Sequence, residues 1–94
     1  IVINKRMEKT IFKYNLEMTD EQKIELPAGA KILTVQLQND LPVMWALVNP
    51  DNPLVKRIIE IYGTGHPVTT ISDIKYISTF QRSKGFVGHV FEKI

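Results

Sequence analysis

Residues 31–48 read KILTVQLQNDLPVMWALV, and this stretch decides the fold. Its first half alternates apolar and polar side chains, which predicts a strand with Leu33, Val35 and Leu37 on one face. After the short link NDLP, residues 43–48 form a run that is apolar on both faces, as in a strand covered on both sides or lying at an interface. Two strands joined by so short a link predict an antiparallel hairpin.

Alternation with period two continues on both sides of this hairpin. Further strands are predicted at residues 10–16, 23–26, 55–62, 75–81 and 86–91. In the fourth of these ranges the pattern puts Tyr76, Ser78 and Phe80 on one face. Arg57 and Ile58 interrupt the alternation in the third, which leaves a bulge or a helical turn open there. Seven short strands without a helix of useful length predict an all-β fold, a single small antiparallel β-sandwich or barrel.

Length and composition are those of one globular domain. The chain has 94 residues, 44% of them hydrophobic and 23% charged, and no apolar run approaches the roughly 20 residues that span a bilayer. We expect an N-terminal extension at residues 1–6 and a single β domain at residues 7–94. The absence of cysteine excludes disulfides and thiolate chemistry, and the beginning of the sequence lacks the features of a signal peptide, so we expect a cytoplasmic protein.

The charge balance gives little support for nucleic-acid binding. Twelve basic residues stand against ten acidic ones, for a formal charge of +2. Basic residues do gather near the two termini, close to aromatic ones, as on β domains that hold single strands: they are Lys5, Arg6, Lys9, Lys13, Arg82, Lys84 and Lys93. Because Glu8, Glu17 and Glu92 interrupt this positive field, a mixed-charge surface is the favoured interpretation and nucleic-acid binding an alternative.

No pattern marks a catalytic or metal site. His66 and His89 are the only histidines, and the spacings typical of metal ligands are missing. A triad could be assembled on paper from Ser72 or Ser78, either histidine and Asp73, but the sequence has no nucleophile-elbow motif. We therefore predict no catalytic residue, no metal and no cofactor.

The stretch IYGTGHP at residues 61–67 opens the longest connection of the chain, residues 63–73. Its backbone N–H groups could surround an anion and its imidazole could handle a proton, so Tyr62, Gly63, Thr64, Gly65 and His66 are candidate ligand-binding residues. The alternative is a turn in which the glycines supply positive φ and the proline fixes the exit. We favour the turn as the main role of this stretch.

The doubly apolar run at residues 43–48 predicts self-association. In a small sandwich one face of each strand meets water, so Met44, Ala46 or Val48 is expected to contact a second subunit or a covering loop. Trp45 is expected in the core, with an interface anchor as the alternative. A homo-oligomer is the predicted state.

Several segments together carry a resemblance that spans nearly the whole chain from Met7 onward. They are residues 9–50, IYGTGHP, YISTFQ and GHVFE. The chain resembles a family of small uncharacterised proteins encoded by bacteriophages and prophages, whose pattern runs AKIL-VQ, WALV-P, FGTGHP, GTFQ and HVFE. Tyr62 and Ser78 are mild departures from that pattern. The resemblance implies a phage or prophage origin and the same β-rich domain, but no activity.

We therefore expect a non-enzymatic accessory protein that acts as a small binding module, through self-association and binding of a host macromolecule or small ligand. A structural or virion-associated protein is the first alternative, and a domain that binds single-stranded nucleic acid is the second.

Overall fold

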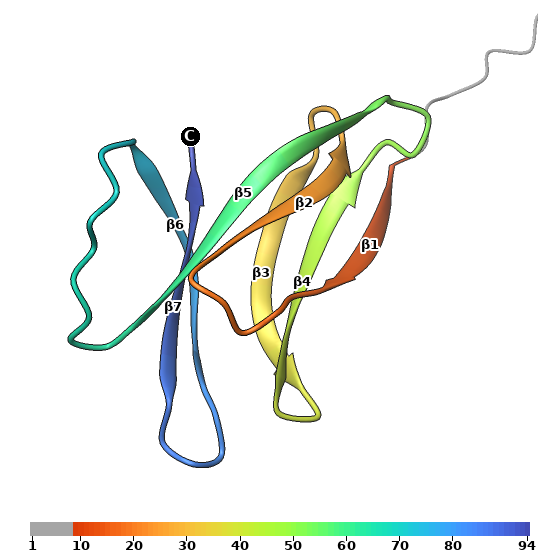
Figure 1. Ribbon diagram of the computed structural model, residues 1–94. Coiled ribbons are helices and arrows are strands. Elements are labelled where there is room, and N and C mark those ends of the chain that lie inside the picture. The colour runs from red at the N-terminus through yellow and green to blue at the C-terminus, as the bar shows by residue number, and fades with distance from the viewer. Residues whose placement is uncertain (1–8) are drawn as a thin grey trace, which may run out of the picture.

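The computed structural model describes residues 9–94, which form an antiparallel all-β protein (Figure 1). The strands are β1 (Thr10–Asn15), β2 (Glu21–Pro27), β3 (Lys31–Gln38), β4 (Leu41–Val48), β5 (Leu54–Gly63), β6 (Ile74–Gln81) and β7 (Val87–Lys93). The described residues contain no helix, and hence none long and apolar enough to cross a membrane. The predicted all-β class is confirmed. The extension predicted at residues 1–6 lies outside the described residues.

The strands form two sheets. Sheet A has the order β1-β4-β3, and sheet B has the order β2-β5-β7-β6. The predicted hairpin is present as β3 and β4, and its turn residues Asn39 and Asp40 both have positive φ, 51° and 63°. Such a pair is typical of a two-residue type I′ turn, whose twist matches that of the strands.

The core lies between the inner faces of the two sheets. Its largest fully buried side chains include Leu26, Val35, Met44, Val48, Ile59 and Val90. Each comes from a strand position with the period-two spacing that burial on one face requires. The apolar face of each sheet is covered by the other sheet, because the described residues offer no helix for that purpose.

In β3 and β6, the residues that face the core differ from those predicted by alternation, because each strand contains a bulge. The register of β3 with β4 shifts between Ile32 and Thr34, and the register of β6 with β7 shifts between Tyr76 and Ser78. The extra residue reverses the side on which the strand's first residues point. Leu33 is therefore 42% exposed and Tyr76 55% exposed, although alternation placed them with buried residues.

Both bulges lie where β3 of sheet A meets β6 of sheet B, and Ser78 joins the two strands there. The buried backbone N–H of Val35 donates a hydrogen bond of 2.9 Å to Ser78 Oγ, and Ser78 Oγ also lies 2.9 Å from Thr34 Oγ1. A side-chain oxygen thus supplies the partner that a neighbouring strand would give a backbone amide.

The tips of two hairpins are joined in a similar way. Asp40, in the turn between β3 and β4, accepts hydrogen bonds from the backbone N–H of Ser83 at 2.9 Å and from its hydroxyl at 3.0 Å. Ser83 lies in the turn between β6 and β7. These hydrogen bonds, with a smaller contribution from Arg82, hold the pKa of Asp40 below its usual value.

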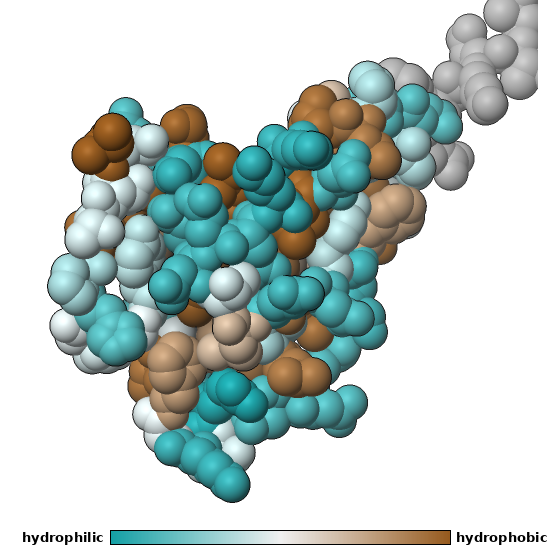
Figure 2. All heavy atoms as spheres, viewed as in Figure 1, coloured by the Kyte–Doolittle hydropathy of each residue, from teal (hydrophilic) through white to brown (hydrophobic). Residues whose placement is uncertain are grey.

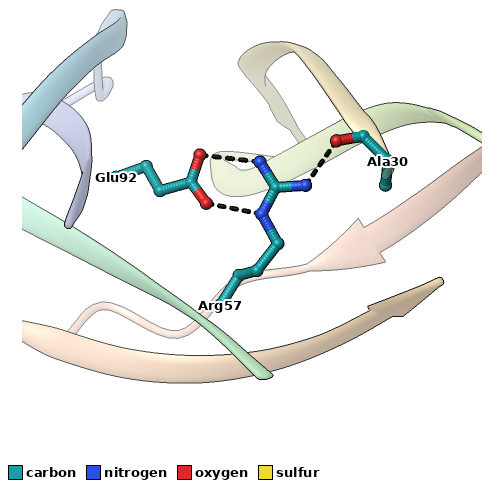
Figure 3. A network of polar contacts seen from close by, with 3 residues as sticks. All are labelled: Ala30, Arg57 and Glu92. Carbon is teal, nitrogen blue, oxygen red and sulfur yellow. Dashed lines mark hydrogen bonds and ion pairs between the residues drawn. The ribbon is translucent and has the colours of Figure 1, made fainter. Parts of the chain in front are cut away.

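Arg57 explains the interrupted alternation in β5. The strand is continuous in its register with both neighbours, so the predicted bulge or helical turn is absent. Figure 3 shows the Arg57 guanidinium between two groups: it donates to both carboxylate oxygens of Glu92, one at 2.8 Å, and to the carbonyl oxygen of Ala30. Glu92 belongs to β7 and Ala30 directly precedes β3, so the arginine connects the two sheets.

The structure reverses the predicted roles of the two faces of β4. Met44, Ala46 and Val48 belong to the core cluster and are at most 1% exposed, because they face sheet B across the interior. These three side chains therefore have no surface for a second subunit. Trp45, expected in the core, is half-buried on the opposite face of the strand.

The connection from β5 to β6 is long for a topological reason. Both strands are antiparallel to β7, which lies between them, so they run parallel to each other. Gly63 pairs with Gly88 and Ile74 pairs with Lys93, so residues 64–73 must return along β7 by roughly 17 Å. Figure 1 shows this connection standing away from the strands beside it. We call residues 64–73 the crossover loop.

Replacing Ser78 by alanine should destabilise the fold, because the buried amide of Val35 loses its acceptor. We expect the free energy of unfolding to fall by about 1–3 kcal/mol in urea denaturation. Ser72→Ala removes a hydroxyl from the crossover loop and serves as the control, with an expected change within about 0.5 kcal/mol. Equal effects of the two substitutions would contradict the bridging role of Ser78.

Candidate functional site

The candidate site is the region where the crossover loop passes the outer face of sheet B. Hydrophilic residues cover the middle of the face in view in Figure 2, over β2 and β5. Two of the hollows that adjoin the loop share Tyr62 and His66 in their linings. The smaller hollow lies at the start of the loop, and the larger lies between the loop and strands β2, β5 and β7.

The GTGHP stretch forms the predicted turn. The N–H of His66 donates to the carbonyl of Gly63 at 3.1 Å, and Gly65 has a φ of 87° that favours glycine. Gly63 does not have the predicted positive φ, but a Cβ there would lie 3.1 Å from the imidazole of His66 and 3.2 Å from the ring of Phe86, so these side chains would have to shift for a larger residue. A side chain at position 63 would therefore be crowded by its neighbours, and a side chain at position 65 would be disfavoured by the backbone conformation.

The five candidate ligand-binding residues line one hollow. Tyr62, Gly63, Thr64, Gly65 and His66 surround a space of about 250 Å³ together with His89. His89 lies opposite Tyr62 in the pairing of β7 with β5, a neighbourhood that the sequence alone does not reveal. The turn and a ligand-binding surface are therefore compatible at these residues, and their role in binding stays a prediction.

His89 stands at the centre of a hydrogen-bond chain. Its Nε2 lies 2.7 Å from Thr64 Oγ1 and its Nδ1 lies 3.0 Å from Thr79 Oγ1, which in turn is 2.8 Å from the hydroxyl of Tyr76. A histidine that acts as a general base in a triad is normally oriented by a carboxylate. Here hydroxyl groups occupy both ring nitrogens, an arrangement that orients the imidazole.

The triad assembled on paper does not come together. Ser78 lies at the junction of β3 and β6, hydrogen-bonded to Val35, and the partners of His89 are the two threonines described above. His66 is exposed in the loop. In the part of the chain that the structure describes, the hydrogen bonds of Ser78 and His89 link neither of them to Asp73.

The larger hollow, which we call the crossover cleft, has a volume of about 600 Å³. Its polar lining residues include Asp20, Glu21, Glu60, Tyr62, His66 and Lys93. These residues come from the β1–β2 connection, from three strands of sheet B and from the crossover loop. Three carboxylates against one lysine make this lining predominantly acidic.

Glu60 is the most unusual residue of the cleft. It is only 5% exposed, and its Oε1 is buried without a hydrogen-bond partner. Its other carboxylate oxygen, Oε2, is 3.9 Å from Lys93 Nζ, which makes a closer contact of 3.0 Å with Glu21 Oε1. A buried carboxylate oxygen without a partner costs stability, so it calls for an explanation beyond packing.

The acidic lining changes the pKa values of its neighbours. Burial raises the pKa of Tyr62, and the negative charge of Glu60 raises it further, followed by the charges of Glu21 and Asp20. The hydrogen bond to Glu21 raises the pKa of Lys93 against the opposing effect of desolvation, with added attraction from Glu21 and Glu60. Both shifts report a negative potential inside the cleft.

A metal site does not emerge from this arrangement. Within residues 9–94 no group of three or more His, Asp or Glu side chains is placed so that it could hold a metal ion. Nor does sequence patterning point to the cleft, since Glu60 occupies an ordinary polar position of an alternating strand. Only the crossover loop and the pairing with β2 turn that position into a buried one.

The comparisons with known proteins place the chain in a family. The family model of DUF7352, a domain of unknown function, matches residues 7–94. The chain belongs to this family. The comparison with curated proteins found no match, and the comparison with solved structures found none. Membership of DUF7352 therefore carries no activity over to the crossover cleft.

Titration of Tyr62 should report the charge of Glu60. Because the pKa is raised in the folded protein, the stabilising contribution of Tyr62 is fully present below the unfolded pKa of about 10 and is lost as pH rises through the raised value. In Glu60→Gln the midpoint of Tyr62, followed by ¹³C NMR of the ring, should move down but stay above 10, because burial remains. Tyr14 is the internal control, since its pKa is raised by burial alone. An unchanged Tyr62 midpoint would contradict this assignment.

Proposed function

We propose that this protein is a non-enzymatic binding module whose ligand site is the crossover cleft. The observation that carries the proposal is that Glu60 lines the cleft while its buried Oε1 has no hydrogen-bond partner. A carboxylate in this position is costly for the folded protein alone and becomes satisfied when a ligand donates to it. Proteins commonly retain such costly groups where they bind a ligand.

Binding is favoured over catalysis by the polar groups present. The imidazole of His89 is held by two hydroxyl groups, and the described residues do not bring it together with a serine and a carboxylate. The cleft holds acidic groups and one lysine around an open space, which suits recognition of a charged partner. These features support a protein that acts by binding a ligand in the cleft rather than by catalysing a reaction.

The proposal extends to the setting of the protein. The resemblance of residues 7–94 to small phage and prophage proteins supports a phage or prophage origin and a site of action in the host cytoplasm. Small accessory proteins of this kind often act stoichiometrically, by binding a host macromolecule or a small ligand. Lys93 and Arg82, two of the basic residues near the C-terminus, face carboxylates of this chain, which makes them poor candidates for phosphate contacts.

Self-association is a second part of the proposal, now through the outer face of sheet A. Ile11 pairs with Leu47 in adjacent strands, and Trp45 lies two residues further along the same face of β4. Ile11 is 56% exposed, while Trp45 and Leu47 are half-buried. Adjacent apolar and aromatic side chains of this kind are typical of protein interfaces.

Ligand binding at the cleft can be mapped by NMR. Ribose, acetate, imidazole and putrescine, each titrated separately into ¹⁵N-labelled protein, provide neutral, anionic, weakly basic and cationic probes. We expect at least one of them to shift the amide signals of residues 60–71 and 93 more than those of β1 and β4. If no probe shifts these amides, or if the shifts concentrate on sheet A, the crossover cleft is not the ligand site.

Self-association can be tested by sedimentation velocity at micromolar concentration. The wild-type protein should sediment as a small closed oligomer, and Ile11→Lys and Trp45→Lys should each shift it toward the monomer, because a buried charge without a partner is costly. Ile94→Lys, which changes an apolar residue that is 76% exposed at the C-terminus, is the control. A monomeric wild-type protein would contradict the oligomer, and open-ended assembly would favour a structural or virion-associated role.

A further inference from the structure

Two carboxylates face each other directly on the floor of the crossover cleft. Glu21 of β2 and Glu60 of β5 are paired residues in adjacent antiparallel strands. Like charges in directly opposed positions destabilise a sheet. Asp20 precedes Glu21 and lines the same cleft, so a third carboxylate adds to the repulsion. Among the described residues of the lining, Lys93 is the one lysine or arginine beside these carboxylates.

Lys93 shows which kind of group this floor accepts. Its ammonium is 3.0 Å from Glu21 Oε1 and 3.9 Å from Glu60 Oε2, and it is the internal cation of the cleft. It leaves Glu60 Oε1 without a partner. One ammonium therefore satisfies part of this acidic surface and leaves the most buried oxygen unpaired.

We propose that the crossover cleft binds ligands through a primary ammonium group, which donates to Glu60 Oε1 and is attracted by Glu21 and Asp20. This inference rests on the proposed function and names the chemical class of its ligand. A free organic amine and the lysine side chain of a protein partner both carry this group.

The geometry favours an ammonium over the other cations. A metal ion needs several ligands in a defined arrangement, and no group of three such side chains occurs in the described part of the chain. A guanidinium binds best to both oxygens of one carboxylate, whereas Glu60 offers one free oxygen because Lys93 faces the other. An ammonium is a compact donor of three hydrogen bonds, which it can give to separate groups.

Access to Glu60 depends on the side chain of Lys93. Because Oε1 is buried, an incoming ammonium must reach it by displacing a neighbouring group. Lys93 has a flexible stem, its side chain is 26% exposed, and its closer partner is Glu21, so it can turn away from Glu60 while keeping that contact. The lysine is thus both an obstacle and a competitor for the ligand, and its removal should strengthen binding.

Isothermal titration calorimetry at neutral pH and low ionic strength tests the inference, with putrescine as the probe. Glu60→Gln should weaken binding at least about tenfold, because the neutral amide is a weaker acceptor for the ammonium than the charged carboxylate. Lys93→Gln should strengthen binding several-fold. Glu25→Gln and Lys56→Gln remove the same charges from exposed positions of β2 and β5 and should change the affinity less than twofold.

Two further probes complete the test. The fully methylated form of putrescine, with a trimethylammonium group at each end, carries the same two charges without an N–H donor and should bind at least about tenfold more weakly than putrescine. Lysine blocked at both its amino and carboxyl ends carries the side-chain ammonium alone: tighter binding of this compound than of putrescine indicates a protein lysine as the source, and the opposite order indicates a free amine.

The inference is overturned if putrescine does not bind, if its fully methylated form binds equally well, or if both Glu60→Gln and Lys93→Gln leave the affinity unchanged. Should Glu60→Gln fail to fold, Lys93→Gln decides alone. Unchanged putrescine binding in that variant shows that Lys93 does not compete with the ligand for Glu60, and it overturns the inference. If ribose or acetate shifts the cleft amides while putrescine does not bind, only the ammonium inference fails. If none of the probes shifts them, the proposed function fails as well.

Discussion

An arginine that points into the interior needs a partner, and the way Arg57 finds one organises this fold. On the inner face of β5 its charge would be costly, but Glu92 supplies two carboxylate oxygens and Ala30 a carbonyl. Since Ala30 directly precedes β3 of sheet A and the other two residues belong to sheet B, pairing the charge also fixes how the sheets meet. The contacts of Ser78 and Asp40 extend this junction along β3 and to its turn.

The candidate site depends on the strand order of sheet B. Because β7 separates β5 from β6, the chain has to return along sheet B, and residues 64–73 make this return without forming a helix. Polar positions that would face water on an ordinary outer sheet surface are partly enclosed by the crossover loop. Glu60 lies on the outer face of sheet B, where a charged side chain normally meets water, but here it is buried beside the loop. This burial of a charged group distinguishes the cleft from the rest of the outer face.

Sequence patterning was a good guide to the strands and a poor guide to the junctions between them. Alternation predicted all seven strands, because burial on one face imposes period two. It misplaced Leu33 and Tyr76, since a bulge changes the phase of a strand without leaving a mark in composition. The GTGHP stretch was correctly identified as a turn from its glycines. Glu60, Glu21 and Lys93 were missed because cross-strand pairing and the path of a loop bring them together.

The crossover loop is attached to the rest of the protein chiefly at its ends. Its first residues are held by the hydrogen bond from His66 to Gly63, and Asp73 accepts one from the N–H of Ile94. Between these points the side chains of Pro67, Val68 and Ile71 are exposed, so their identity matters little to the sheets below. Evolution or a protein engineer can therefore exchange the middle of this segment to alter specificity, much as antibody frameworks accept new hypervariable loops.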